Sequence, residues 1–331
     1  MALRVAVIGA GSWGTTVAAL STVNNPTILW ARRKDVADEI TTAHTNSAYL
    51  PGVTLPDELS STPSLSEAVG TADVVVMAVP SHGFRVVLEE AAPYVRAWVP
   101  IVSLTKGLEQ GTRLRMTQVI NEVLPDHPAG ALTGPNLARE IVAGQPAGAV
   151  MAFADERIAV GLQPVFRAAH FRVYTNLDIV GCEIGGVVKN VIAIAAGMVD
   201  GMGFGDNTKA TVMTRGLAEL ARLGGALGGD PITFAGLAGM GDLVATCMST
   251  QSRNHHVGVE LGRGRCLEEI VAEMNMVAEG VKSSSVVADL AAEHGVEMPI
   301  AEQVRAVCHE GITARDAMRA LLQRRTGFEW E

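Results

Sequence analysis

The stretch from Leu3 to Gly14, LRVAVIGAGSWG, constrains the fold more than any other part of the sequence. Leu3 to Ile8 is a short apolar run typical of a buried parallel strand, and an alanine-rich helical pattern follows it. Gly9, Gly11 and Gly14 permit a tight turn, close approach of the backbone to a pyrophosphate, and close helix-strand packing. The G-x-G-x-x-G motif alone is weak evidence, but its place between a strand and a helix predicts a dinucleotide-binding turn.

A basic segment follows the second predicted strand, Thr27 to Trp30. Arg32 and Arg33 stand where an NAD-specific fold commonly has an acidic residue that binds the adenosine ribose. Arginines suit the 2′-phosphate of NADP instead, so we predict NADP or NAD as cofactor, with NADPH preferred. The alternative is a solvated basic loop in which Asp35 pairs with one of the arginines.

Strand patterns alternate with helical patterns over residues 1–180, which predicts an α/β domain with a doubly wound parallel sheet of the Rossmann type. The further strands are expected within Ala72–Gly83, Val99–Thr112, Ala131–Glu140, Gly148–Phe153 and Phe171–Asn176, and helices within Phe84–Tyr94 and Arg113–Leu124. Ligands bind beyond the carboxyl ends of such strands, so Pro80, Lys106, Gly134 and Asn136 should share one rim. Lys106 contacts a substrate there or is an ordinary loop lysine.

Residues 181–331 show helical patterns and no strand pattern, which predicts an all-helical second domain. Helices are expected at Glu183–Val199, Thr208–Leu223, Gly241–Cys247, Asn254–Gly262, Cys266–Met274, Gly280–Glu293, Ile300–Glu310 and Thr313–Gln323. No flexible linker or internal repeat separates the two halves. We therefore expect them to pack closely around a cleft.

The first helix of this half carries a lysine in an apolar run. Between Ile184 and Val199 only Lys189 and Asn190 interrupt the apolar and small residues. An ammonium group buried without a partner is unfavourable. Lys189 therefore either lies along the surface with its head in water or is a catalytic amine that exchanges a proton with a substrate.

Polar side chains accompany the glycines between Ala235 and Gly258. Asp242 stands at a predicted helix start and shares one helix face with Thr246, although a simple N-terminal charge or cap is an alternative for Asp242. Ser252, Arg253 and Asn254 introduce the next helix, where such donors suit a phosphate. The alternative is that Arg253 is an ordinary surface side chain.

The composition indicates a soluble, acidic protein. The formal net charge of −9 over 331 residues argues against nucleic acid or an anionic membrane as the main partner. We expect no signal peptide and a cytoplasmic location. We also expect no stable membrane insertion, because no uninterrupted apolar run is long enough to span a bilayer. The cysteines form no C-x-x-C motif and are expected to be reduced: Cys182, Cys247, Cys266 and Cys308. The adjacent His255 and His256 have no partner at metal-ligand spacing, so we predict no metal site.

Six motifs together resemble the bacterial NAD(P)-dependent glycerol-3-phosphate dehydrogenases. In order along the chain, from Val5 to about Glu310, they are GAGSWGT, SLTKG, TGPN, GGVVKN, GLAGMGDL and SRN. The resemblance implies reversible reduction of dihydroxyacetone phosphate, a phosphorylated triose, to sn-glycerol 3-phosphate. In that family the product supplies the backbone for glycerophospholipid synthesis.

The resemblance also implies roles for single residues. Besides the glycines, cofactor positions are Ser12, Trp13, Arg32, Arg33, Tyr49, Ala138, Val277 and Glu279. Substrate positions are Gly134, Asn136, Lys189, Asn190, Asp242, Ser252 and Asn254, and Lys106 and Arg253 serve both ligands. Lys189 is the proton-transferring residue, with Lys106 and Asp242 in support. Asn136 stands where the family more often has a serine, and its amide can still donate to the substrate. From the sequence alone, helix capping or solvation is the default interpretation of Glu279.

Two other functions are considered. The 6-phosphogluconate and β-hydroxyacid dehydrogenases also have a Rossmann half and a catalytic helix lysine, but they have asparagine four residues after it, where this chain has Ala193. A non-catalytic NAD(P) sensor would not need Lys106, Lys189 and Asp242. The sequence does not determine the oligomeric state, for which a homodimer is one option.

Overall fold

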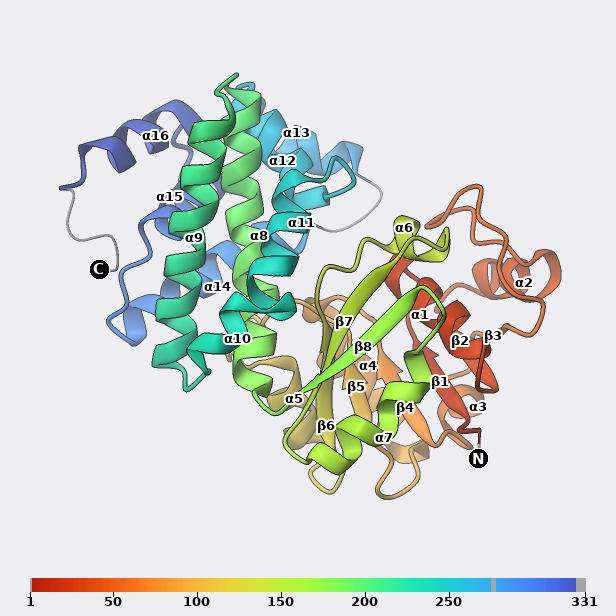
Figure 1. Cartoon of the computed structure of the whole chain (residues 1–331). Helices are drawn as coiled ribbons and strands as arrows, with labels where there is room; N and C mark the ends of the chain where they lie inside the picture. The colour runs from red at the N-terminus through yellow and green to blue at the C-terminus, as the bar shows by residue number, and fades with distance from the viewer. Residues whose placement is uncertain (1, 275–277, 326–331) are drawn as a thin grey trace. The chain divides into compact units, whose positions relative to one another are not determined.

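The computed structural model describes residues 2–274 and 278–325. The chain divides into two compact units, Met1–Ile179 and Val180–Glu331 (Figure 1). The following description takes each unit by itself, as unit 1 and unit 2.

Unit 1 is built on a single eight-stranded sheet among its described residues, in the order β3-β2-β1-β4-β5-β6-β7-β8. The strands are β1 (Val5–Ile8), β2 (Thr27–Trp30), β3 (Ser60–Thr62), β4 (Val74–Met77), β5 (Ile101–Ser103), β6 (Ala129–Thr133), β7 (Ala147–Phe153) and β8 (Phe171–Asn176). The order reverses between β1 and β4, which is the switch point where doubly wound sheets bind ligands. The predicted Rossmann-type fold is confirmed.

The sheet is mainly parallel, as predicted, and its last two strands depart from that arrangement. β7 pairs antiparallel with β6, and β8 then runs parallel to β7 at the sheet edge (Figure 1). The chain reverses between Thr133 and Ala147, in a connection that contains the five-residue helix α6 (Ala138–Val142).

Helices cover both faces of this sheet because alternate strand residues point to opposite sides. In β1, Val5 and Val7 join the cluster formed with α1 (Ser12–Thr22), α2 (Lys34–Ala43) and α7 (Glu156–Phe166). Ala6 and Ile8 join the other cluster, with α3 (Leu65–Val69), α4 (Ser81–Ala91) and α5 (Met116–Val123). A 3₁₀ turn, η1 (Ala92–Tyr94), follows α4.

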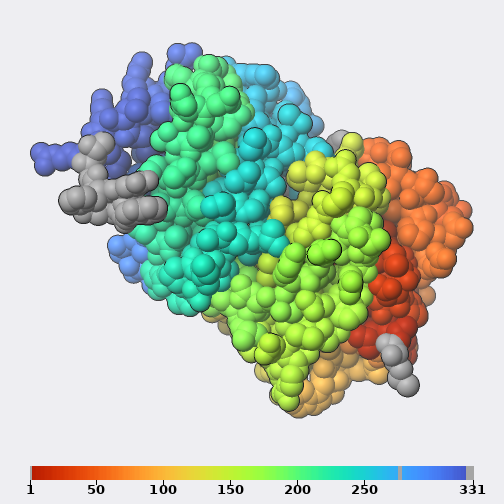
Figure 2. Space-filling view, in the orientation of Figure 1, coloured from red at the N-terminus to blue at the C-terminus, as the bar shows by residue number. Residues whose placement is uncertain are grey.

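The described residues of unit 2 form helices and no strand, as predicted. They are α8 (Ile179–Gly201), α9 (Asp206–Ala226), α10 (Pro231–Ala235), the π-helical turn η2 (Leu237–Gly241), α11 (Asp242–Met248), α12 (Arg253–Gly262), α13 (Leu267–Glu273), α14 (Glu279–Glu293), α15 (Pro299–His309) and α16 (Ala314–Gln323). α16 lies at the outer surface of the unit, in blue in Figure 2.

α8 is the core helix of unit 2. Every residue from Gly181 to Val199 is buried. By length and composition α8 would reach across a membrane, although Lys189 and Asn190 interrupt its apolar run. Of its most apolar 18-residue window, 89% is buried inside the structure, as in the core helix of a soluble protein.

Glycines bring α8 and α12 into backbone contact. A Cβ on Gly197 would lie 2.1 Å from the carbonyl oxygen of His255, and one on Gly258 would lie 2.1 Å from that of Ile194. Gly201 and Gly262 make the matching contacts one turn further along. Any side chain at these positions would force the two helices apart, so the start of α12 has a defined place against α8.

Candidate active site

The glycine-rich turn lies at the switch point of the sheet. Gly9 has φ of +121°, and a Cβ there would lie 2.7 Å from the carbonyl oxygen of Ala78, just after β4. A Cβ on Gly14 would lie 2.0 Å from the carbonyl oxygen of Gly9. Both positions therefore require glycine, one for its backbone angle and both for space.

The start of α1 offers backbone amides to an anion. Gly11 is the N-cap and supplies no side-chain cap, and a Cβ on it would meet nothing within 4 Å. A helix start without a side-chain cap, and with space beside its N-cap glycine, suits a pyrophosphate. Trp13 packs edge-on against Phe171, and its buried Nε1 has no hydrogen-bond partner among the described residues. These features fit a dinucleotide.

Asn46 is a site residue that the sequence did not reveal. Its fully buried side chain donates from Nδ2 to the carbonyl oxygen of Ala10 and to Oγ1 of Thr15, both at 2.9 Å. It thereby ties the segment after α2 to the glycine-rich turn. No local motif marks it, because its partners lie more than thirty residues away.

The basic segment after β2 is exposed. Arg32 and Arg33 are both exposed, and Arg33 forms a two-pronged ion pair with Asp35. This hydrogen bonding lowers the pKa of Asp35. Tyr49 is half-buried and close enough to Arg33 to influence its pKa. The pairing that was an alternative to phosphate binding is thus present, and a 2′-phosphate would compete with Asp35 for Arg33.

Three rim residues of unit 1 come together at the ends of β5 and β6. Lys106 Nζ donates to the carbonyl oxygen of Gly134 at 2.7 Å, and Gly134 has φ of +124°. Asn136 follows, and both polar atoms of its carboxamide are buried without a partner among the described residues. A buried carboxamide rarely lacks partners, so Asn136 is available to a ligand. Ala138 begins α6, and its carbonyl oxygen accepts from Thr16 Oγ1 at 3.4 Å.

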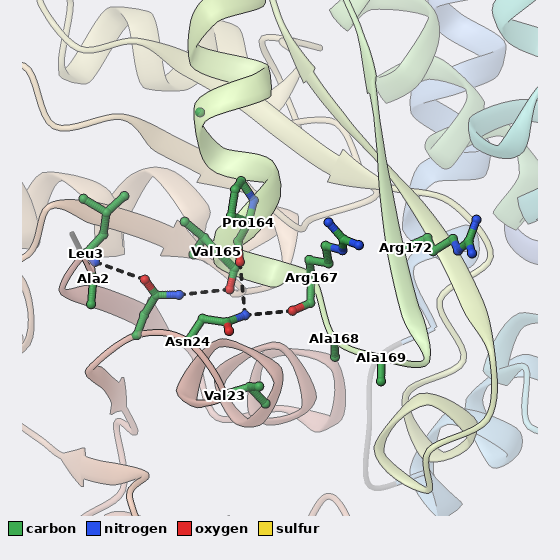
Figure 3. A pocket seen from close by; sticks show the side chains of 12 residues that line it. Ala2, Leu3, Val23, Asn24, Pro164, Val165, Arg167, Ala168, Ala169 and Arg172 are labelled. Carbon is green, nitrogen blue, oxygen red and sulfur yellow. Dashed lines mark hydrogen bonds between the residues drawn. The ribbon is translucent and has the colours of Figure 1, made fainter.

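The cavity shown in Figure 3 lies elsewhere in unit 1. It measures about 770 Å³ and is lined by Ala2, Leu3, Val23, Asn24, Asn25, Gly161, Pro164, Val165, Arg167, Ala168, Ala169 and Arg172. Asn24 Nδ2 donates to the carbonyl oxygens of Pro164 and Arg167 at 3.2 and 2.8 Å. None of the predicted site residues lines this cavity.

Lys189 is buried in unit 2 and has two partners on α11. Its Nζ donates to Thr246 Oγ1 at 2.7 Å and lies 3.1 Å from Asp242 Oδ1. Thr246 Oγ1 in turn donates to Asp242 Oδ1 at 3.3 Å. Burial raises the pKa of the neighbouring Cys247 to about 12. The thiol is therefore neutral, and the amine is the group here suited to exchange a proton.

Two glycines let η2 pack closely against α8 and α10. A Cβ on Gly185 would lie 2.5 Å from the carbonyl oxygen of Ala238, and one on Gly239 would lie 2.2 Å from that of Phe234. The glycines in the sequence suggested that the backbone closely approaches another group, and in this structure that group is the backbone of a neighbouring helix. This packing sets the start of α11, and hence Asp242, against the Lys189 helix.

The SRN segment begins α12 as predicted. Ser252 is the N-cap, and its Oγ accepts from the backbone N–H of His255 at 3.2 Å. Arg253 is exposed as a residue, yet desolvation lowers the pKa of its guanidinium, opposed by attraction from Glu279. Glu279 is the first residue of α14. Val277 lies outside the described residues.

The two adjacent histidines have separate environments. His255 is buried and its Nε2 lies 2.8 Å from Asp200 Oδ2, whereas His256 is exposed. Among the described residues, no three His, Cys, Asp or Glu side chains are grouped to hold a metal ion.

A doubly wound sheet with an open glycine-rich turn, and a buried lysine paired with a carboxylate, define a dinucleotide-dependent dehydrogenase. The comparisons with known proteins specify the family. The chain matches the N-terminal model of NAD-dependent glycerol-3-phosphate dehydrogenase over residues 4–159 and the C-terminal model over residues 178–319. It belongs to this family.

Similar proteins match over nearly the whole chain. A glycerol-3-phosphate dehydrogenase [NAD(P)+] of Sphingopyxis alaskensis is 59% identical, covering 99% of both chains. One of Mycobacterium avium is 53% identical, covering 98% of this chain and 96% of its own. The crystal structure of glycerol-3-phosphate dehydrogenase from Coxiella burnetii has a TM-score of 0.93 at 36% identity, covering 98% of this chain and 99% of its own.

Proposed function

We propose that this protein catalyses the reversible reduction of dihydroxyacetone phosphate to sn-glycerol 3-phosphate with NADPH or NADH. Full-length similarity to enzymes of that name supports the proposal. The observation that carries it is the Lys189-Asp242-Thr246 group, a buried amine held by two side chains on a core helix. A structural core has no need of such a group, whereas carbonyl reduction needs a proton donor.

Unit 1 would hold the dinucleotide. The amides at Ser12 and Trp13 would bind the pyrophosphate, Arg32 and Arg33 the 2′-phosphate, and Tyr49 and Ala138 are further contacts. Glu279 and Val277, in the other half of the chain, are assigned to the cofactor by the resemblance alone. When bound, the nicotinamide supplies the hydride for C2 of the ketone. The proposed preference for NADPH rests on the two arginines at positions 32 and 33, where an NAD-specific fold commonly has an acidic residue.

Lys189 would supply the proton. The C2 oxygen gains negative charge as the ketone is reduced, and an ammonium group stabilises that charge before it donates a proton. Asp242 accepts from the amine and orients it, and Thr246 limits its rotation. Lys106, held by Gly134, adds positive charge in support.

Arg253 would bind the phosphate of the substrate. Its planar guanidinium takes two phosphate oxygens at once, and it stands at a helix start where backbone amides favour an anion. Ser252 uses its hydroxyl to cap α12, so its contribution would come mainly through that cap. The unpartnered carboxamide of Asn136 would contact the substrate beside Lys106 and Gly134.

The proposed setting is cytoplasmic, where the product supplies the backbone for glycerophospholipid synthesis. We also propose that the enzyme is a homodimer and neither binds nucleic acid nor inserts stably into membranes. The net charge of −9 supports the last two points.

A steady-state assay tests the proposal. Purified protein should oxidise NADPH, and NADH less efficiently, when dihydroxyacetone phosphate is added, and sn-glycerol 3-phosphate should accumulate in equal amount. Turnover of a β-hydroxyacid or 6-phosphogluconate instead would favour the related dehydrogenases. Cofactor binding without turnover of any ketone or hydroxyacid would favour a sensor.

A further inference from the structure

Three helices of unit 2 are joined by a line of buried hydrogen bonds. The backbone N–H of Gly280, in the first turn of α14, donates to Asn254 Oδ1 on α12 at 2.9 Å. Asn254 Nδ2 donates to Asn190 Oδ1 on α8 at 2.8 Å. Asn190 Nδ2 donates to the carbonyl oxygen of Gly186 at 3.2 Å. Asn254 and Asn190 are 7% and 4% exposed, so water competes little for these bonds.

The direction of this line is determined by its two ends. Gly280 presents a backbone N–H, which only donates, and Gly186 presents a carbonyl oxygen, which only accepts. Each asparagine between them must therefore accept on one side and donate on the other. A carboxamide does this in one orientation only, so both amide orientations follow from the backbone.

Gly280 also makes a close contact that ties α14 to the lysine helix. A Cβ at this position would lie 2.5 Å from the carbonyl oxygen of Asn190 and 2.9 Å from Asn254 Oδ1. Ala278, the N-cap of α14, provides no side-chain cap. Asn254 thus supplies from another helix an acceptor that the local sequence lacks.

The start of α12 is held independently of any ligand. Ser252 caps it, the glycine contacts place it on α8, and the next residue, His255, pairs with Asp200 at 2.8 Å. Lys209 Nζ also lies 2.7 Å from Asp200 Oδ2. Asn254 therefore has a defined position, and its carboxamide forms hydrogen bonds to both α8 and α14.

We propose that Asn254 and Asn190 are positioning residues that couple the start of α14, which carries Glu279, to the Lys189 turn of α8. This inference rests on the proposed function, which places Glu279 at the cofactor and Lys189 at the substrate. It revises the expectation that Asn254 is mainly a phosphate ligand, because its oxygen and one N–H are already engaged. Binding of the dinucleotide and proton transfer then depend on the same line of hydrogen bonds.

Asn254→Asp tests the coupling, because it preserves size but replaces the donor with a second acceptor facing Asn190. We expect the Kd of NADPH, measured by fluorescence without any triose phosphate, to rise about fivefold or more, with a parallel fall in kcat. A residue that binds only the substrate phosphate would raise KM for dihydroxyacetone phosphate and leave the NADPH Kd unchanged.

Gly280→Ala tests the same link without a change of charge. Its methyl group would press on Asn190, so we expect the same joint effect on NADPH binding and kcat. Two matched controls lie on the exposed surface of α9: Asn207→Asp and Gly225→Ala, where a Cβ on Gly225 would meet nothing within 4 Å. Both should match wild type.

Lower pH should rescue Asn254→Asp. Once protonated, the carboxyl group that this substitution introduces would again accept from Gly280 and donate to Asn190, so the NADPH Kd of the variant should approach the wild-type value as pH falls from about 8 to about 6. Gly280→Ala should show no such recovery. The coupling is overturned if both folded variants keep NADPH Kd and kcat within about twofold of wild type. Wild type that binds NADPH but does not reduce the triose phosphate would instead contradict the proposed function.

Discussion

Lys189 Nζ lies 3.1 Å from Asp242 Oδ1, and the two side chains are 7% and 2% exposed. Burying such a pair carries a large desolvation penalty, and well-packed apolar residues often serve stability equally well. Thr246 completes the arrangement by donating to the carboxylate and accepting from the amine. The burial of this ion pair is best explained by a role of the Lys189 amine in proton transfer.

Asp242→Asn should therefore lower kcat more than cofactor binding. The amide keeps the size of the side chain but no longer balances the ammonium, so we expect kcat to fall by about tenfold or more. Loss of one partner of a buried pair should also destabilise the fold by about 3–5 kcal/mol, which thermal unfolding measures. If Asp242 only caps α11, stability will drop while kcat per folded molecule stays at the wild-type level.

Arg33 should govern the choice between cofactors. Arg33→Glu should weaken NADPH binding by about tenfold or more and affect NADH far less, because only NADPH carries the 2′-phosphate. Asp35→Asn should release Arg33 from its ion pair and tighten NADPH binding. Fluorescence titration with each nucleotide measures both effects. Equal losses for NADPH and NADH in Arg33→Glu would show that Arg33 supports the loop instead.

Arg253 should carry the specificity for a phosphorylated substrate. Arg253→Ala should reduce kcat/KM for dihydroxyacetone phosphate, since the guanidinium both binds and orients the substrate. The expected reduction corresponds to a loss of about 2–4 kcal/mol of transition-state stabilisation. Unphosphorylated dihydroxyacetone should be a very poor substrate that the mutation scarcely worsens. Equal loss on both ketones would mean that Arg253 does not bind the phosphate.

Glu219 should make the stability of unit 2 depend on pH. Its buried carboxyl group accepts from the backbone N–H groups of Ile300 and Ala301 at 2.7 and 3.1 Å, at the start of α15. Burial raises its pKa from 4.5 to about 7, against the pull of those two N–H groups. The folded state then binds more protons than the unfolded state between these values, so the free energy of unfolding should decrease as pH rises through this window.

Urea unfolding across this pH range measures that dependence, with Glu219→Gln as the matched variant. Glutamine keeps one acceptor and cannot ionise, so its unfolding free energy should lose this part of the pH dependence. An unchanged pH profile would show that another group is responsible.

Local patterns were sufficient to predict the Rossmann-type sheet and the helical second half. The strand, turn and helix at residues 3–22 are marked by apolar runs and glycines, and Asp242 and Thr246 share a helix face because they are four residues apart. β3 and the helices α2, α3, α6, α7 and α10 were not predicted. β3 has only three residues, none of them strongly apolar, and pairing with β2 forms it.

Relationships between distant segments could not be predicted in the same way. Asn46 reaches Ala10 across the sequence, and Gly280 contacts Asn190 only after three helices have packed. The alternating pattern of strands and helices gave no sign that β7 pairs antiparallel with β6. The glycines of α8 and α12 are explained only by the packing of the two helices, since each glycine makes room for the backbone of the other helix.

The kcat of Lys189→Met with dihydroxyacetone phosphate and NADPH tests the central claim most directly. Methionine preserves the length of the side chain and removes the amine, so kcat should fall by about a hundredfold or more while the Kd of NADPH hardly changes. A variant that keeps more than about a tenth of wild-type kcat would contradict the assignment of proton transfer to Lys189.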